Sequence, residues 1–291
     1  MTQQVAVVTG AGGGYGREVA VALAAAGARV VAADRLEQAS ALEATVERIT
    51  KANGSAVSVS ADLSTMSGGD AVVRKAVEEY GALDVLFCAS SVTRDASILD
   101  ISVADWDATI AGTLKSAFVC VRDAAVVMRQ QRSGRIILTT SGLGLGRLAD
   151  SSGLVASTAA TAGIAGIVRV VYRDMARYGV AVNAIDTDMV TGGYNRDSAW
   201  TPPGEESSKP EEATALAVYL ALNEAAAQVT GETFFVSKER IGVYSRYRQD
   251  ITESRAGGWN LEQVKQHFAT LDAGERLAHV AVPGPNLVNA R

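Results

Sequence analysis

Residues 5–16 read Val5-Ala6-Val7-Val8-Thr9-Gly10-Ala11-Gly12-Gly13-Gly14-Tyr15-Gly16. The apolar, β-branched start predicts a buried strand, and the stretch 16–26 predicts a helix. Gly10 allows a tight turn between the two, and Gly14 and Gly16 let backbone N–H groups and the helix N-terminus approach a pyrophosphate closely. Such a turn is also a common structural device. Its place between a strand and a helix favours a dinucleotide site formed by Gly10, Gly14, Tyr15 and Gly16.

A carboxylate follows the second apolar stretch of the chain. Ala28–Ala33 predicts a strand, and Asp34 ends it, 18 residues beyond Gly16. A carboxylate at this point accepts hydrogen bonds from a ribose 2′-OH and repels a 2′-phosphate. Asp34 therefore indicates NAD rather than NADP, although the neighbouring Arg35 leaves NADP open.

Strand-like and helix-like stretches alternate along most of the chain. Strands that are apolar throughout suit a parallel sheet covered on both faces. Their alternation with helices is typical of a Rossmann-type, doubly wound α/β fold. Further strands are predicted at Ala56–Ser60, Val85–Cys88, Arg135–Thr140, Val180–Ile185 and Thr233–Val236. Further helices are predicted at 39–52, 68–80, 103–132, 155–178 and 210–222.

The strand–helix pattern stops near residue 244. The length of 291 residues allows one large domain or two small ones. The sequence predicts a single Rossmann-type domain over residues 1–243 and a C-terminal extension over residues 244–291, with one helix at Leu261–Leu271. The clearest loop is Thr201–Lys209, which is rich in Pro, Gly and Ser.

Composition excludes several classes of protein. Lys and Arg number 27 against 32 Asp and Glu, so the net charge of −5 favours neither nucleic acid nor an anionic membrane as partner. The two cysteines are too few for a disulfide scaffold, and both histidines (His267 and His279) lie near the C-terminus, so no metal site is predicted. We find no apolar run of membrane-spanning length and no secretion signal, and the sequence therefore predicts a cytoplasmic protein.

Several motifs resemble the short-chain dehydrogenase/reductase family in sequence and order. Thr9-Gly10-x-x-x-Gly14-x-Gly16 has the family's spacing, and 134–141 resembles the strand that ends in the catalytic serine, here Ser141. Ala61-Asp62-Leu63 is similar to the segment that contacts adenine, which makes Asp62 and Leu63 cofactor candidates. The resemblance covers roughly residues 3–240. It implies a Rossmann-type fold, NAD as cofactor and hydride transfer.

The end of this region resembles a narrower branch of the family. Lys209-Pro210-Glu211-Glu212, 231–242 and Trp259-Asn260-Leu261-Glu262 are similar to the dehydrogenase part of peroxisomal-type multifunctional enzymes. This similarity implies 3-hydroxyacyl-CoA chemistry, in which a hydride passes from the hydroxyl-bearing carbon to NAD.

The catalytic positions depart from the family pattern. The resemblance implies a Tyr base, a Lys four residues later that acidifies it, and a supporting Asn, but these positions hold Ser157, Thr161 and Thr113. Only Ser141 matches. No Tyr lies between residues 80 and 172 and no Lys between residues 115 and 209, so shifting the alignment restores neither.

The nicotinamide half of the predicted site departs from the pattern too. The family's Asn-Asn-Ala-Gly is Cys88-Ala89-Ser90-Ser91, and its Pro-Gly after the sixth strand is Thr187-Asp188, preceded by Asp186. Carboxylates near a pyrophosphate weaken its binding unless they are paired. The adenosine half is expected to be intact and the nicotinamide half degenerate.

Substitute groups are possible for the missing Tyr and Lys. Ser157 and Thr161 are either a hydroxyl relay or small residues that fill the space. Tyr194, on a glycine-rich loop, either offers a phenol to the site or is an aromatic residue that serves only in packing. Lys115 either offers a cation to the site or is an ordinary surface lysine. In the tail, basic and aromatic residues that include Arg246 are candidates for a CoA phosphate or a partner subunit.

Three functions compete at this point. The first is a non-catalytic subunit that pairs with an active homologous dehydrogenase subunit through the long helices 103–132 and 155–178, in a dimer or tetramer. The second is an active NAD-dependent 3-hydroxyacyl-CoA or alcohol dehydrogenase with an unusual acid. The third is a regulatory module that binds a nucleotide or CoA.

Overall fold

The computed structural model describes residues 3–145, 153–188, 190, 208–237, 239–244 and 260–272. The chain divides into two units, Met1–Tyr244 and Ser245–Arg291. The division falls one residue beyond the domain boundary expected from the sequence. In the second unit the described residues include helix α8, Leu261–Asp272.

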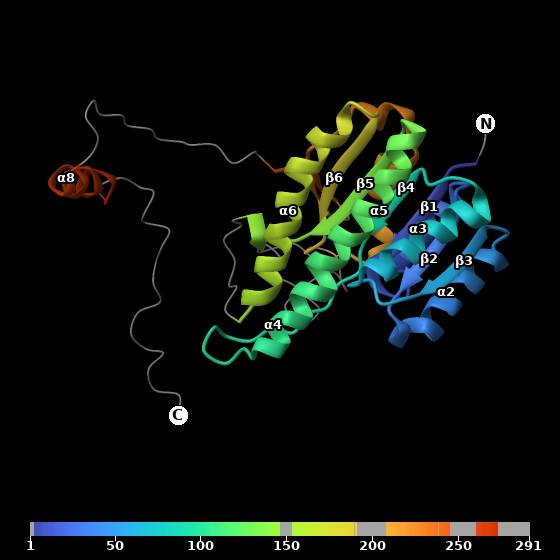
Figure 1. Cartoon of the computed structure of the whole chain (residues 1–291), viewed down its shortest axis with the longest axis horizontal. Coiled ribbons are helices and arrows are strands. Elements are labelled where there is room, and N and C mark those ends of the chain that lie inside the picture. Colours follow the sequence, from blue (N-terminus) through green and yellow to red (C-terminus); the bar gives the residue numbers. More distant parts are fainter. Residues whose placement is uncertain are drawn as a thin grey trace. The chain divides into compact units, whose positions relative to one another are not determined.

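An eight-stranded sheet with the order β3-β2-β1-β4-β5-β6-β7-β8 forms the centre of the first unit (Figure 1). Its strands are β1 Val5–Thr9, β2 Arg29–Asp34, β3 Ser55–Ser60, β4 Val85–Cys88, β5 Gly134–Thr140, β6 Val180–Asp186, β7 Thr233–Val236 and β8 Ile241–Val243. Neighbouring strands from β3 to β7 pair in parallel, and only β8 is antiparallel to its neighbour. The predicted Rossmann-type fold is confirmed.

Helices cover both faces of the sheet. They are α1 Gly14–Ala25, α2 Ala39–Lys51, α3 Met66–Tyr80, α4 Val103–Thr109, α5 Ser116–Gln131, α6 Val155–Ala176 and α7 Thr214–Leu222. Successive strand residues point to opposite faces, so Leu86 packs into the core under α3, α5 and α6 while Phe87 packs into the core under α1, α2 and α7. Figure 1 shows α5 and α6 side by side on one face of the sheet.

The predicted helix 103–132 is interrupted. A π-helix, Ile110–Lys115, separates α4 from α5. Within it, the buried Thr113 hydroxyl donates to the Val92 carbonyl and accepts from the Val92 N–H, both at 3.0 Å. π-Helical turns occur mostly as local bulges, often at functional sites. This one attaches the segment after β4 to the helix layer.

Helix α6 is long and apolar enough to cross a membrane by length and composition alone. The sequence analysis found no unbroken apolar run of that length, and α6 meets the test although Ser157, Thr161 and Arg169 interrupt its apolar residues. The inner face of α6 buries Ile164, Ala165 and Val168, and the helix packs against β5 and β6. Its apolar character is explained by that role in the core.

The interface between α3 and α5 holds a partly buried carboxylate. A Cβ on Gly69 would lie 2.9 Å from Asp123 Oδ2, and Oδ2 has no hydrogen-bond partner among the described residues. Burial raises the pKa of the Asp123 carboxyl, the nearby Arg122 opposes this, and Asp70 adds to it. The ionised form is therefore disfavoured in the folded protein.

We expect Asp123→Asn to stabilise the protein at pH 7 by about 0.5 kcal/mol, because the variant removes a partly desolvated charge. A carboxyl with a raised folded pKa stabilises the fold at low pH, and this contribution is lost as the pH rises through the unfolded pKa and the folded pKa. The advantage of the variant should therefore vanish in acid. Denaturant unfolding from pH 3 to pH 7 measures it, with the exposed Asp107→Asn as control, and a loss of stability at pH 7 would contradict the assignment.

Candidate functional site

The glycine-rich turn lies against the end of β4. Gly10 has a φ of +72°, and a Cβ there would lie 2.6 Å from the carbonyl carbon of Ala89. A Cβ on Gly16 would lie 2.3 Å from the Gly10 carbonyl oxygen. Only glycine fits at either position without movement of the backbone. The turn is thus placed between β1 and β4, the neighbouring strands at which the chain order of the sheet changes direction, and ligands of open α/β sheets bind at such a point.

The N-terminus of α1 is free to bind an anion. Its N-cap is Gly13, none of the described side chains caps it, and its first turn carries no acidic residue. Unpaired N–H groups and the helix dipole favour negative charge at this end. The Arg17 guanidinium donates to the Gly12 carbonyl and so brings a cation to the turn, a contact that the motif spacing did not predict.

The Tyr15 side chain packs in the core and does not point to the open side of the turn. Its ring is buried and its hydroxyl donates to the Ala213 carbonyl at 2.9 Å. Burial raises the pKa of this phenol. Tyr15 was predicted to contact the cofactor from the turn. It can therefore offer a ligand only its backbone groups.

Asp34 braces the turn from the end of β2. The carboxylate is 5% exposed; Oδ2 accepts the Gly12 N–H and Oδ1 accepts the Arg35 N–H, both at 2.8 Å. Each carboxylate oxygen has a second lone pair, so Asp34 retains capacity for ribose hydroxyls. The structure brings Asp34 next to the turn, as the sequence predicted.

A cavity of about 300 Å³ lies between the ends of β2, β3 and β4 and the helix segment that contains Gly112. Both predicted adenine residues, Asp62 and Leu63, line it, together with Ser90 and Val92. Leu63 is buried. This volume is at the lower end of the range of small-molecule pockets and suits a nucleoside.

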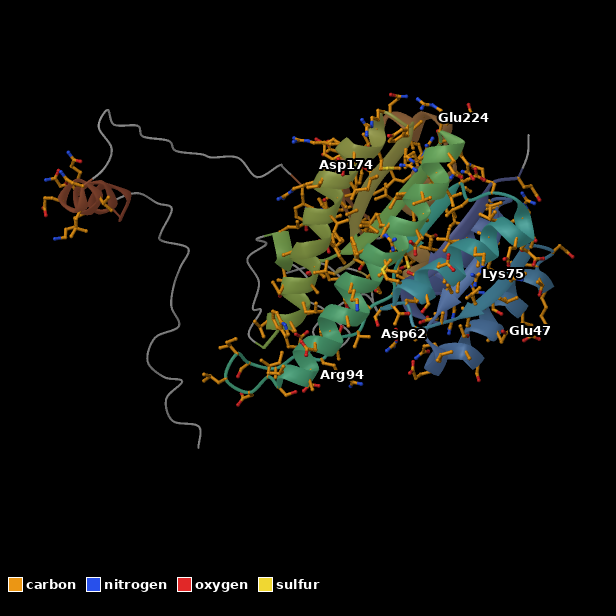
Figure 2. All side chains as sticks on the ribbon, in the orientation of Figure 1. Glu47, Asp62, Lys75, Arg94, Asp174 and Glu224 are labelled. Atoms are coloured by element: carbon orange, nitrogen blue, oxygen red, sulfur yellow. The ribbon has the colours of Figure 1, made fainter. Side chains whose placement is uncertain are left out.

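Two arginines on the wall of this cavity extend the predicted set. They are Arg35, at the end of β2, and Arg94, in the segment after β4. Asp62 and Arg94 are labelled in Figure 2. The sequence drew attention to Arg35 but had no signal for Arg94, because no strand, helix or motif contains it.

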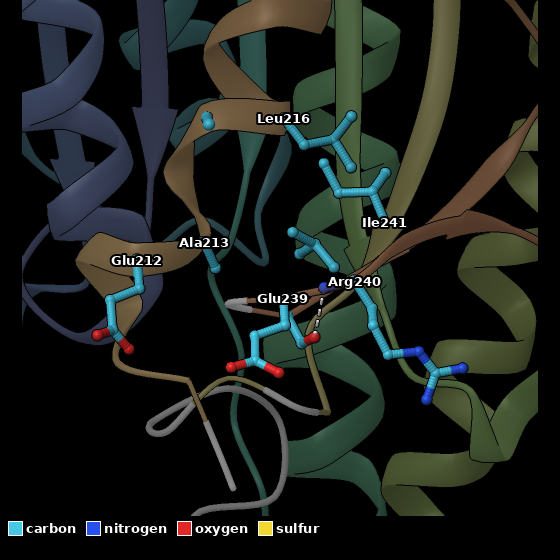
Figure 3. Close-up of a pocket in the computed structure, with 9 residues that line it drawn as sticks. Glu212, Ala213, Leu216, Glu239, Arg240 and Ile241 are labelled. Carbon is cyan, nitrogen blue, oxygen red and sulfur yellow. Dashed lines mark hydrogen bonds between the residues drawn. The ribbon is translucent and has the colours of Figure 1, made fainter. Parts of the chain in front are cut away.

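A second cavity of about 300 Å³ lies between the start of α7 and the β7–β8 hairpin (Figure 3). Glu212, Leu216, Glu239 and Arg240 are among its lining residues. None of the predicted site residues lines it, and the Glu212 carboxylate already accepts the Lys209 N–H at 2.9 Å. The nucleotide site is therefore assigned to the first cavity.

The residues at the Tyr and Lys positions bond to their own helix. Ser157 Oγ donates to the Leu154 carbonyl at 3.4 Å, and its N–H donates to Asp95 Oδ1 at 3.0 Å. Thr161 is fully buried, and its hydroxyl donates to the Ser157 carbonyl at 2.9 Å. A hydroxyl bonded back to its helix in this way has its one proton engaged and can offer a ligand only its acceptor lone pairs. The space-filling interpretation of Thr161 fits this geometry better than a relay does.

Ser141 is held within the protein as well. Its hydroxyl donates to Asp188 Oδ2 at 2.8 Å and accepts the Leu143 N–H at 3.2 Å. Asp188 Oδ2 also accepts the Gly142 N–H at 3.0 Å. The serine that matches the family's catalytic position thus gives its only proton to a buried carboxylate.

Asp186 and Tyr244 extend this network at the end of β6. Asp186 Oδ1 accepts the Asp188 N–H at 2.9 Å, and Asp186 Oδ2 accepts the Tyr244 hydroxyl at 2.5 Å. Asp186 is 1% exposed and Asp188 is 5% exposed. The sequence had placed Tyr244 at the start of the extension and gave no sign of this contact, which joins residues 58 positions apart.

The other candidates have ordinary surroundings. Cys88 and Cys120 belong to one core cluster, and the neighbouring Cys120 thiol together with burial raises the pKa of the Cys88 thiol, which keeps it protonated and unreactive. Lys115 is exposed at the end of the π-helix. Among the described residues, no cluster of His, Cys, Asp or Glu could hold a metal. Tyr194, Arg246 and His279 lie outside the described residues.

Comparison with known proteins identifies the family. The family model for the short chain dehydrogenases matches residues 4–200. The chain belongs to the short-chain dehydrogenase/reductase family. The resemblance found in the sequence is confirmed, and the family makes an NAD(P)-type cofactor the expected occupant of the site.

Three relatives illustrate the match. A 3-oxoacyl-[acyl-carrier-protein] reductase of Synechocystis sp. is 33% identical over 241 residues, 81% of this chain and 96% of the relative. Hydroxyacyl-CoA dehydrogenase ChsB1 of Mycobacterium tuberculosis is 33% identical over 264 residues, 84% of this chain and 80% of the relative. The crystal structure of a short chain dehydrogenase from Mycobacterium avium has a TM-score of 0.81 and 33% identity, and covers 94% of this chain and 95% of its own.

We expect Gly10→Ala to cost about 3 kcal/mol of folding stability, because the new Cβ adds a backbone clash to the strain of a positive φ. Gly27→Ala is the matched control: its φ is +95° and nothing lies within 4 Å of a Cβ there, so it should cost about 1 kcal/mol. Urea unfolding of the two variants separates clash from strain. Equal losses would show that the turn does not press against β4.

Proposed function

We propose that the protein is a non-catalytic member of the short-chain dehydrogenase/reductase family that retains the adenosine half of the cofactor site and pairs with an active homologous subunit. The hydrogen bond from Ser141 to Asp188 carries the proposal. A serine that positions a substrate oxygen must donate its proton to that oxygen. Here the same proton is given to a carboxylate of the protein.

The side chains at the base positions support the same conclusion. An unperturbed Tyr titrates near pH 10, and a nearby cation brings it closer to neutrality, whereas serine and threonine hydroxyls are far weaker acids. Loss of one positioned acid or base costs roughly 10²–10⁴ in rate, and loss of a cooperating set costs about 10⁶. Ser157 and Thr161 replace both the base and its cation.

The buried carboxylates Asp186 and Asp188 lie at the end of β6, where the family resemblance places the nicotinamide half of the cofactor. The Ser141 and Tyr244 hydroxyls and the main-chain N–H groups of Gly142 and Asp188 donate hydrogen bonds to these carboxylates. A carboxylate near a pyrophosphate weakens its binding unless the carboxylate is paired. This supports a site that prefers the adenosine end of its ligand to the nicotinamide end.

The outer faces of α5 and α6 support association with another subunit. Phe118 and Val126 on α5 are 49% and 48% exposed, and Val170 on α6 is 60% exposed. The small residues Ala162 and Gly166 are exposed on α6 and allow close helix contact. These exposed apolar side chains on neighbouring helices are our candidates for the contact with another subunit.

The names of the relatives support a substrate class for the assembled enzyme. One is a 3-oxoacyl-[acyl-carrier-protein] reductase and another a hydroxyacyl-CoA dehydrogenase. We infer that the complex oxidises or reduces the 3-position of an acyl thioester, with NAD as the expected cofactor of its active subunit. The second candidate, an active dehydrogenase with an unusual acid, is favoured by the 33% identity to ChsB1 over most of this chain.

We expect the purified chain to show no hydride transfer with NAD or NADP and a panel of 3-hydroxyacyl-CoA and 3-oxoacyl-CoA thioesters, measured by absorbance of the reduced nicotinamide. If the active-dehydrogenase alternative holds, turnover is present and Ser141→Ala lowers it by about 10²–10⁴. Turnover that depends on Ser141 in the isolated chain would overturn the proposal.

The partner is tested by affinity purification of the tagged chain from its native host. We expect a stoichiometric short-chain dehydrogenase that carries both Tyr and Lys at the catalytic positions, with hydride transfer in the eluted complex. Phe118→Glu together with Val170→Glu should release the partner, since charge at a packed helix interface is desolvated without a counterion. An oligomer made only of this chain would contradict the proposed pairing.

A further inference from the structure

The second cavity, between the start of α7 and the β7–β8 hairpin, has no part in the proposed function. It shares no lining residue with the first, the nucleoside cavity at the ends of β2, β3 and β4. Its volume of about 300 Å³ is at the lower end of the range of small-molecule pockets. A ligand that fills this cavity is therefore small.

One wall of the second cavity is apolar. Ala213 and Leu216, around the start of α7, and Val236, at the end of β7, line it and belong to one buried core cluster. Ile241 on β8 completes this wall and is 61% exposed. An aliphatic chain that covers Ile241 removes apolar surface from water, and this favours binding.

The charged groups of the cavity are mainly carboxylates. They belong to Glu212 and Glu239, and Figure 3 shows both on the side away from the Leu216 side chain. The Glu239 carboxylate forms no hydrogen bond or ion pair with any residue in the described part of the chain. The guanidinium of Arg240, which also lines the cavity, lies 5.6 Å from the centre of the Phe235 ring, and that ring is outside the lining. The cavity is therefore negative and favours a cation.

A buried hydroxyl in the lining has a proton to give. Ser237 is 8% exposed, and its Oγ accepts the Arg240 N–H at 3.1 Å. The same hydroxyl donates to none of the residues that the structure describes. A serine hydroxyl can donate one hydrogen bond as well as accept, and a buried donor needs an acceptor. A ligand in this cavity can supply that acceptor.

We propose that the second cavity binds a short aliphatic ammonium ion that carries a hydrogen-bond acceptor, such as a protonated amino alcohol. The ammonium group pairs with the Glu239 carboxylate in a charge-assisted hydrogen bond. The alkyl chain lies against Leu216 and Ile241, and the acceptor takes the Ser237 proton. The inference goes beyond the proposed function, because it concerns a separate cavity and needs neither a nucleotide nor hydride transfer.

The test is saturation-transfer NMR of the full chain with three probes of equal chain length: 4-amino-1-butanol, n-butylamine and 1,4-butanediol. The amino alcohol should bind most tightly, with a Kd on the order of millimolar. The diol lacks the charge and should bind about tenfold more weakly, and butylamine lacks the acceptor and should bind about fivefold more weakly.

Glu239→Gln should lower the affinity for the amino alcohol about tenfold and leave that for the diol within about twofold, because only the ammonium group uses the charge. Ser237→Ala should reduce the affinity for the amino alcohol to that for butylamine. Glu224→Gln is the matched control, since Glu224 is an exposed glutamate outside the cavity.

The proposal is overturned if none of the probes binds, if the diol binds as tightly as the amino alcohol, or if Glu239→Gln and Glu224→Gln bind the amino alcohol equally well. Because binding is measured without cofactor or substrate, hydride transfer by the isolated chain would overturn the proposed function and leave this result intact.

Discussion

The contact between Gly10 and the backbone of Ala89 determines the form of the whole site. It joins the end of β1 to the end of β4 with no space for a side chain, so the turn and the start of α1 have one available position. Asp34 then ties β2 to the same turn through the Gly12 N–H. This arrangement positions the ends of β1, β2 and β4, the N-terminus of α1 and the nucleoside cavity.

The two halves of the site differ in how their polar groups are satisfied. On the side predicted to hold adenosine, α1 begins without a side-chain cap, and Arg35 and Arg94 are among the residues that line the cavity. On the other side, Ser141, Asp188, Asp186 and Tyr244 bond to one another, and Thr161 bonds to its own helix. Buried polar groups need partners. Where the protein itself supplies the hydrogen-bond partners, few donors and acceptors are left for a substrate. This constraint explains the difference between the two halves of the site.

Local patterns explain which elements were predictable. The seven predicted strands occur within one residue of their expected ends, because each is a short apolar or β-branched run bounded by turn residues. Strand β8 was not predicted, since its three residues include Gly242 and depend on pairing with β7. The helix 103–132 was predicted unbroken, because the π-helix depends on contacts with Val92 rather than on its own residues.

The sequence by itself determined the fold class and the glycine-rich turn, and it predicted Asp34 at the site and Ser157 and Thr161 at the positions of the family's Tyr and Lys. Each of these depends on which residue types stand at a short spacing in the sequence, and such a pattern can be read from the sequence alone. Only the tertiary structure decided that Ser141 donates to Asp188, that Tyr244 closes on Asp186, and that Arg94 reaches the wall of the nucleoside cavity. These contacts join residues tens of positions apart. The parallel sheet brings together the strand ends that carry these residues. No single segment of the sequence encodes that arrangement.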